Sequence, residues 1–295
     1  MQSESIVGAR RSSPVLPLTL LALVAFAGNS LLARLALTRT AIDPASFTSI
    51  RLIAGAMVLF LIFKLRRGTH ASAGSWPSAA ALFVYAAAFS FAYVHLTTGT
   101  GALLLFGAVQ ATMITVGVLR GERLTMVQGG GLLCAYAGLV ALVLPGLASP
   151  PLLSATLMLA AGVAWGVYSL RAKGAGDPIA ATAGNFARAV QLTLVLSFLF
   201  RDARTLDAPG IRYALASGAL ASGIGYAVWY TALRDLRATT AATVQLSVPV
   251  LAALGGVLLL SEPLTARLLG AGAAILGGVA LVVLTRRPTI RQVGE

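Results

Sequence analysis

Ten apolar runs follow one another along the chain, and short polar connections separate them. A helix of about 20 apolar residues, rising about 1.5 Å per residue, crosses the hydrocarbon core of a bilayer. No hydrophilic stretch is long enough to form a soluble domain. The pattern predicts an all-α membrane protein with ten transmembrane helices, expected at residues 16–37, 45–64, 77–95, 100–119, 126–144, 151–171, 180–200, 210–233, 240–260 and 266–285.

The composition points to the same class of protein. Hydrophobic residues make up 58% of the 295 residues and charged residues 11%, whereas soluble domains carry about 25% charged residues. Such a chain cannot cover a surface that faces water, which excludes a soluble enzyme and a disordered chain. The net charge of +13 would suit nucleic acid, but the Lys and Arg residues form short clusters between the apolar runs. We therefore expect membrane lipid, and no nucleic acid, as a partner.

The distribution of positive charge predicts the orientation. Most Lys and Arg residues fall in the connections that share a side with the N-terminus. Because positive charges collect on the cytoplasmic side, both termini are expected to be cytoplasmic, in the inner membrane of a bacterial cell. Residues 10–27 also resemble a signal peptide that would be cleaved after Ala27. The apolar run continues beyond that point to Leu37, which favours a retained first helix.

The two halves of the chain resemble each other. GERLT at 121–125 matches SEPLT at 261–265, and Arg51 and Arg188 lie at similar depths in the second and seventh runs. We expect two five-helix units, residues 1–145 and 146–295. An odd number of crossings places the second unit upside down relative to the first. Secondary transporters are commonly built from such inverted-topology repeats, with the substrate site near the midplane where the repeats meet.

This 5+5 pattern, the arginine in the second helix of each half and the two Glu-x-Leu-Thr turns resemble the drug/metabolite transporter superfamily. Within it, the chain is similar to the EamA-type exporters, including bacterial exporters of aromatic amino acids. The resemblance covers nearly the whole chain. It implies a basket-like ten-helix fold, export of small metabolites and no bound cofactor. Val109 stands where the second half has Pro249, so symmetric bending of the fourth and ninth helices is not expected.

Charged side chains supply the candidates for gating. No Asp or Glu lies deep within an apolar run, so proton-coupled pumping through a buried carboxylate is not expected. Glu122 and Glu262 occupy helix junctions, where each could gate or simply cap a helix. Arg51 and Arg188 lie within runs, and each could bind a substrate carboxylate or brace the fold. We assign gating to Arg51 and substrate binding to Arg188.

Aromatic residues recur at helical spacing. Tyr85 and Phe89 share one face of the third run, Trp165 and Tyr168 share one face of the sixth, and Tyr226 lies in the eighth. Pointing inward, these faces would line a cavity that stacks on flat, apolar substrates. The alternative is packing, or a belt at the membrane interface.

Amides within the runs are further candidates for substrate binding. Asn29, Asn185 and Gln245, together with Gln110, need hydrogen-bond partners when they are removed from water. They could bind the amino and carboxylate groups of a substrate, or join neighbouring helices. The two His residues and the single Cys are too scattered for a metal site or for catalysis. No metal, cofactor or catalytic residue is therefore expected.

Taken together, the sequence predicts a secondary transporter, and not an enzyme, that exports small metabolites by alternating access. Aromatic or hydrophobic amino acids are the expected substrates, driven by their own gradient or by loose coupling to protons. One alternative is an exporter of another small-molecule class, such as a drug, an organic cation or a nucleotide-sugar. The other is a non-transporting membrane assembly protein. A monomer is compatible with these observations, which do not fix the oligomeric state.

Overall fold

The computed structural model describes residues 15–66, 74–146, 149–172, 176–236 and 238–285. Within these residues the structure is helical and contains no strand. In chain order, the helices are α1 (Val15–Arg39), α2 (Pro44–Leu65), α3 (Trp76–Tyr93), α4 (Thr98–Leu119), α5 (Met126–Val143), α6 (Leu152–Ala172), α7 (Pro178–Leu199), the short 3-10 helix η1 (Arg201–Ala203), α8 (Ala208–Ala216), the π-helix η2 (Ser217–Ile224), α9 (Gly225–Leu233), α10 (Ala238–Gln245), α11 (Ser247–Leu260) and α12 (Ala266–Leu284).

Nine helical segments among the described residues are long and apolar enough to cross a bilayer. They coincide with nine of the ten predicted runs, and α10 and α11 together supply one of them. The all-α, multi-pass architecture is therefore confirmed for the described part of the chain. The count of ten spans stays a prediction.

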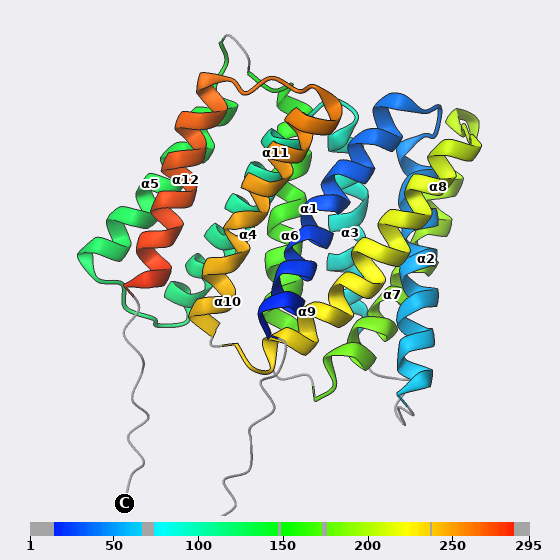
Figure 1. Cartoon of the computed structure of the whole chain (residues 1–295), viewed down its shortest axis with the longest axis horizontal. Helices are drawn as coiled ribbons and strands as arrows, with labels where there is room; N and C mark the ends of the chain where they lie inside the picture. The colour runs from blue at the N-terminus through cyan, green and yellow to red at the C-terminus, as the bar shows by residue number, and fades with distance from the viewer. Residues whose placement is uncertain (1–14, 67–73, 147–148, 173–175, 237, 286–295) are drawn as a thin grey trace, which may run out of the picture.

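The run expected at 210–233 consists of three consecutive segments. Helix α8 leads directly into η2, and η2 leads into α9. Figure 1 shows the three as one continuous rod. A Cβ added at Gly218 in η2 would collide with the main-chain carbonyl of Arg51 in α2. The wider π turns therefore lie where the backbones of two helices come very close.

A break at Leu246 separates α10 from α11. Proline has no N–H group, so Pro249 cannot donate to the carbonyl of Gln245, which is the last residue of α10. In the first half, α4 runs unbroken through Val109. The two halves differ here in the way that the single proline predicts.

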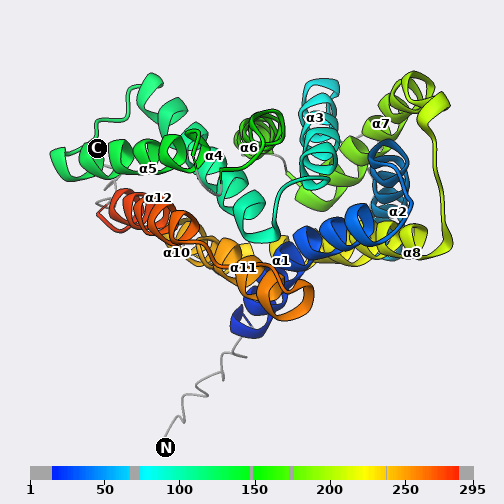
Figure 2. The ribbon, with the colours of Figure 1, turned by 90° about the horizontal axis from the view of Figure 1, so that it is seen from above.

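Helices of the two halves pack against one another. Helix α5 lies along α12, α2 along α7, both α3 and α4 along α6, and α1 against α9 and α11. Seen from above, the helices form two rows that meet near α4, α11 and α1 (Figure 2). The expected boundary at residue 145 falls in the connection between α5 and α6. The assignment of 1–145 and 146–295 as inverted repeats stays a prediction.

Two sides of the molecule can be named by the ends of α1. The Val15 side is where α1 begins and α12 ends, and the Arg39 side is where α1 ends and α2 begins (Figure 1). The predicted cytoplasmic location of both termini rests partly on Arg10, Arg11 and Arg286, which lie outside the described residues.

Candidate functional site

A cavity of about 630 Å³ lies between α1, α3, α4, α6, α9 and α10. Its lining includes Asn29 in the middle of α1 and Phe89 about one turn before the end of α3. It extends to Arg120, Glu122 and Arg234, which follow the ends of α4 and α9 on the Val15 side. No described residue from the helix ends of the Arg39 side belongs to the lining. The cavity therefore opens toward the Val15 side.

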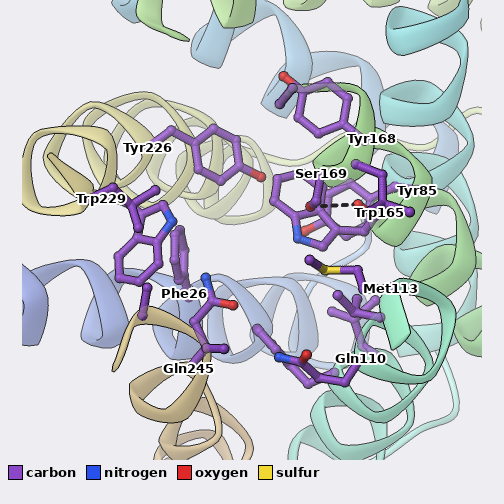
Figure 3. A pocket seen from close by; sticks show the side chains of 18 of the residues that line it. Phe26, Tyr85, Gln110, Met113, Trp165, Tyr168, Ser169, Tyr226, Trp229 and Gln245 are labelled. Atoms are coloured by element: carbon purple, nitrogen blue, oxygen red, sulfur yellow. Dashed lines mark hydrogen bonds between the residues drawn. The ribbon is translucent and has the colours of Figure 1, made fainter. Parts of the chain in front are cut away.

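Trp165 stands at the centre of an aromatic wall (Figure 3). The centroid of its ring lies 4.8 Å from that of Tyr85, 5.2 Å from that of Tyr168 and 5.3 Å from that of Tyr226. Phe89 lines the same cavity, with its ring centroid 5.5 Å from that of Tyr85. The structure thus brings together the five aromatic residues that helical spacing had selected from three different helices.

Polar side chains interrupt this wall. The buried Asn29 accepts a hydrogen bond from Ser217 Oγ at 2.6 Å, and its Nδ2 donates to the Tyr85 hydroxyl at 3.4 Å. Gln110 and Gln245 also line the cavity (Figure 3). A mostly aromatic cavity with a few amides can hold a flat apolar group and orient a polar one.

Asn185 and Arg188 of α7 lie outside the lining of this cavity. Asn185 borders a separate pocket of about 300 Å³, where its Oδ1 accepts from the Ser75 N–H at 2.9 Å and its Nδ2 donates to the Tyr168 hydroxyl at 3.4 Å. Arg188 donates to the carbonyl of Gly184 at 2.9 Å. Their assignment to the substrate site stays a prediction, and in this structure both side chains bond to neighbouring protein groups.

Arg51 lies directly behind the aromatic wall. Its side chain is buried, and its guanidinium carbon sits 4.8 Å from the centroid of Phe89 and 5.5 Å from that of Tyr85. These distances are typical of cation–π contacts. Its Nη1 is buried without a hydrogen-bond partner among the described residues. The predicted role of Arg51 in a gate is not tested by this arrangement.

Glu262 ties three segments together on the Arg39 side. Its Oε1 accepts from Arg34 Nε of α1 at 3.1 Å, and its Oε2 accepts from the N–H of Thr98, the first residue of α4, at 2.7 Å. Arg34 Nη1 in turn donates to the carbonyls of Tyr93 and Val94, each at 3.0 Å. A carboxylate at a helix N-terminus also interacts favourably with the helix dipole. These contacts join α1, the α3–α4 connection and the α11–α12 turn on the Arg39 side, and the predicted gating role of Glu262 stays a prediction.

Sequence reasoning did not select Arg34 as a candidate. The available signal was its register with Arg171, because these two residues are separated by the same interval as Arg51 and Arg188. Nothing in the local sequence of α1 marks it as a partner for a residue 228 positions away.

Glu122 occupies the matching turn between α4 and α5, on the Val15 side. It is exposed and lines the open end of the cavity. The backbone N–H of Glu122 donates to Gly117 at 3.0 Å, and that of Glu262 donates to Gly256 at 3.1 Å. A Cβ at either glycine would collide with the carboxylate that follows it. The two turns are built similarly, with a bond from Glu122 to the fifth preceding residue and from Glu262 to the sixth, and only Glu262 lies on the Arg39 side.

The comparisons with known proteins identify the family. The profile of the EamA-like transporter family matches residues 152–284. An uncharacterized protein of Pseudomonas aeruginosa is 58% identical over 270 residues, which cover 91% of this chain and 94% of that protein. The chain belongs to the EamA-like transporter family. This EamA-like protein is therefore a multi-pass membrane transporter, in agreement with the resemblance to the drug/metabolite transporter superfamily.

More distant relatives agree with this placement. An uncharacterized transporter of Archaeoglobus fulgidus is 26% identical over 208 residues, covering 69% of this chain and 74% of that protein. The uncharacterized transporter YoaV of Bacillus subtilis is 23% identical over 258 residues, covering 83% and 88%. One solved crystal structure, 22% identical, superposes with a TM-score of 0.64 over 91% of this chain and 96% of that one. That structure supports the fold.

The described residues contain no group of three His, Cys, Asp or Glu side chains that could hold a metal ion. The groups that a ligand in the cavity would contact are aromatic rings and amides, with charged residues around them.

Proposed function

We propose that this EamA-like transporter exports aromatic or hydrophobic amino acids across the bacterial inner membrane. The observation that carries the proposal is the aromatic wall around Trp165 in a cavity of about 630 Å³. Small-molecule sites typically occupy about 300–1,000 Å³. An aromatic side chain would stack against the rings of Tyr85, Trp165 and Tyr226. Asn29, with the other lining amides, would bind the amino and carboxylate groups.

We further propose that transport proceeds by alternating access. The cavity is open on the Val15 side and closed by Glu262 and Arg34 on the Arg39 side. With both termini in the cytoplasm, this arrangement is the inward-open state, in which a substrate for export is loaded. The opposite state requires the Arg39 side to open and the Val15 side to close.

The internal register suggests which groups close the Val15 side. Glu122 corresponds to Glu262, and Arg171 corresponds to Arg34. In the present state Arg171 is exposed and its Nε donates to Ser78 Oγ at 3.2 Å. We infer that in the outward-open state Glu122 pairs with Arg171 and accepts from the N-terminus of α10, the counterpart of α4.

The first experiment is uptake of radiolabelled tryptophan, phenylalanine and leucine into proteoliposomes that contain the purified protein. We expect saturable uptake, strongly reduced by Trp165→Ala because this change removes the ring that contacts three others. Trp76→Ala is the matched control, since Trp76 is 52% exposed at the start of α3, outside the cavity lining. Its uptake should equal that of the wild type.

Two results would overturn the proposed substrate class. Uptake of organic cations or nucleotide-sugars without uptake of any amino acid would replace it with another class. Absence of every flux in folded protein would favour the non-transporting alternative.

A further inference from the structure

Arg51 is a buried cation that has no anion beside it within the described part of the chain. Its side chain is 2% exposed, and no described Asp or Glu forms an ion pair with it. Two ring faces, those of Phe89 and Tyr85, contact its guanidinium group. Its Nη1 finds no hydrogen-bond acceptor among the described residues.

Such an arrangement leaves positive potential in the protein interior. A buried charge is stabilised fully only when it is paired and hydrogen-bonded. Ring faces attract a cation, but more weakly than a carboxylate does at close range. The charge of Arg51 is therefore not neutralised by the described carboxylates, and its field favours an anion nearby.

The same two rings form part of the cavity lining. Phe89 and Tyr85 line the cavity, and their rings also contact Arg51, which does not belong to the lining itself. The charged residues in the lining, Arg120, Glu122 and Arg234, all belong to its open end. The other lining residues are uncharged, so Arg51, behind the rings of Phe89 and Tyr85, adds a formal charge next to this uncharged part of the cavity. Its field is screened less in a partly buried site than at an exposed surface.

We propose that Arg51 makes the cavity selective for aromatic carboxylates, including zwitterionic amino acids, and against aromatic amines that are cations. This inference rests on the proposed function and narrows its substrate class. It also gives Arg51 a role in specificity in place of the predicted gate. The carboxylate would lie beside Asn29 and the Tyr85 hydroxyl, which are already joined by a hydrogen bond next to the Arg51 rings.

Three compounds with the same phenyl ring test this selectivity. Labelled phenylalanine is bound to the purified full-length protein, and 3-phenylpropionate (an anion) or phenethylamine (a cation) is added as competitor at neutral pH. We expect the acid to compete at least about tenfold better than the amine, because the positive charge of Arg51 attracts the carboxylate and repels the ammonium group.

Variants connect the selectivity to Arg51. Arg51→Gln should bring the two competitors to within about twofold of each other, and Arg51→Lys should keep the preference for the acid. Arg212→Gln is the matched control, because Arg212 is exposed in α8 and bonds only to its own helix. The control should behave as the wild type does.

The outcomes distinguish a failure of the role of Arg51 from a failure of the proposed function. If phenylalanine binds and the amine competes as well as the acid in the wild type, the role of Arg51 is overturned and the proposed function stands. If folded protein binds neither phenylalanine nor either competitor, the proposed function fails and this inference fails with it. A folded Arg51→Gln that keeps the tenfold preference would also overturn the role of Arg51, and if Arg51→Gln does not fold, a wild type without the preference still overturns it.

Discussion

A single carboxylate joins two helices on the Arg39 side of the molecule, where we predict a gate. Glu262 accepts hydrogen bonds from a guanidinium group of α1 and from the backbone at the start of α4. Its side chain is 10% exposed and that of Arg34 is 18% exposed. Charge-assisted bonds in such a half-buried place contribute more than exposed ion pairs do.

Glu262→Gln should shift the protein toward the state that is open on the Arg39 side. The change removes the charge of the pair, which costs about 1–3 kcal/mol and corresponds to roughly a 5- to 150-fold change in the population ratio. The readout is labelling of a cysteine placed at Ser30 in the cavity, in a Cys134→Ser background, by an impermeant maleimide added from the Arg39 side.

Asp202→Asn provides the matched control for that substitution. Asp202 forms an exposed ion pair with Arg201 at 3.6 Å, and its side chain is 93% exposed. Exposed pairs contribute about 0–1 kcal/mol, so labelling should not change. Equal labelling of Glu262→Gln and the wild type would show that Glu262 does not hold the Arg39 side closed.

At the scale of helices, the contact between α2 and η2 leaves no room for a side chain. Gly218→Ala should destabilise the protein by about 1–3 kcal/mol, because the new Cβ meets the Arg51 carbonyl and the Cβ of Ala54. A thermal unfolding curve in detergent measures the change. Gly130→Ala in α5 is the control, since a Cβ there meets nothing within 4 Å. Equal melting temperatures for the two variants would contradict this account of the contact.

Hydropathy predicted the positions of the helices well. Of the two irregular helical segments, the sequence indicated the break before α11 but not the π-helix η2. Long apolar runs fix where a chain can cross a bilayer, and Pro249 marked the break before α11 because it removes a donor. The π turns of η2 left no mark, because a wider turn changes the backbone hydrogen bonds and not the apolar character of the run. The contact of Arg34 with Glu262 could not be predicted either, because it depends on the tertiary packing of α1 against the α11–α12 turn.

The sequence could predict which residues of the candidate site share one face of a helix. It could not predict which of them line the cavity, because that depends on the side to which the cavity opens. Tyr85 and Phe89 had to share a face of α3 whatever the fold. The predicted repeat places Arg51 and Arg188 at similar depths, but the structure puts Arg51 behind the cavity rings and bonds Arg188 to Gly184. Because the cavity opens on one side only, two positions that the sequence treats as equivalent have different surroundings.

For the whole molecule, the absence of a described carboxylate in the middle of the cavity lining bears on energy coupling. A carrier that relays no proton can run on the gradient of its substrate alone. Phenylalanine should therefore equilibrate across proteoliposomes at equal pH, and an imposed pH gradient should change the initial rate by less than about twofold. Uptake that appears only with a pH gradient would contradict this expectation and would turn attention to Glu122 and Glu262.

The proposed latch on the Val15 side predicts a rescue by charge exchange. Glu122→Arg and Arg171→Glu should each slow transport, because both place like charges together when that side closes. The double variant should recover at least half of the wild-type rate. Arg171→Glu combined with Asp235→Arg is the mismatched control and should stay slow. Equal rates for the two double variants would refute the pairing of Glu122 with Arg171.

The π turns of η2 give this carrier a way to change its binding wall without tilting a helix. One π turn holds about one residue more than an α turn, and one residue corresponds to roughly 100° of rotation about the helix axis. Tyr226 and Trp229 follow η2 directly, and Tyr226 stacks on Trp165. If η2 tightened to α-helical turns, α9 would rotate about its own axis, and the ring of Tyr226 would move away from the ring of Trp165. A change of turn between Ser217 and Ile224 would therefore be enough to take the aromatic wall apart.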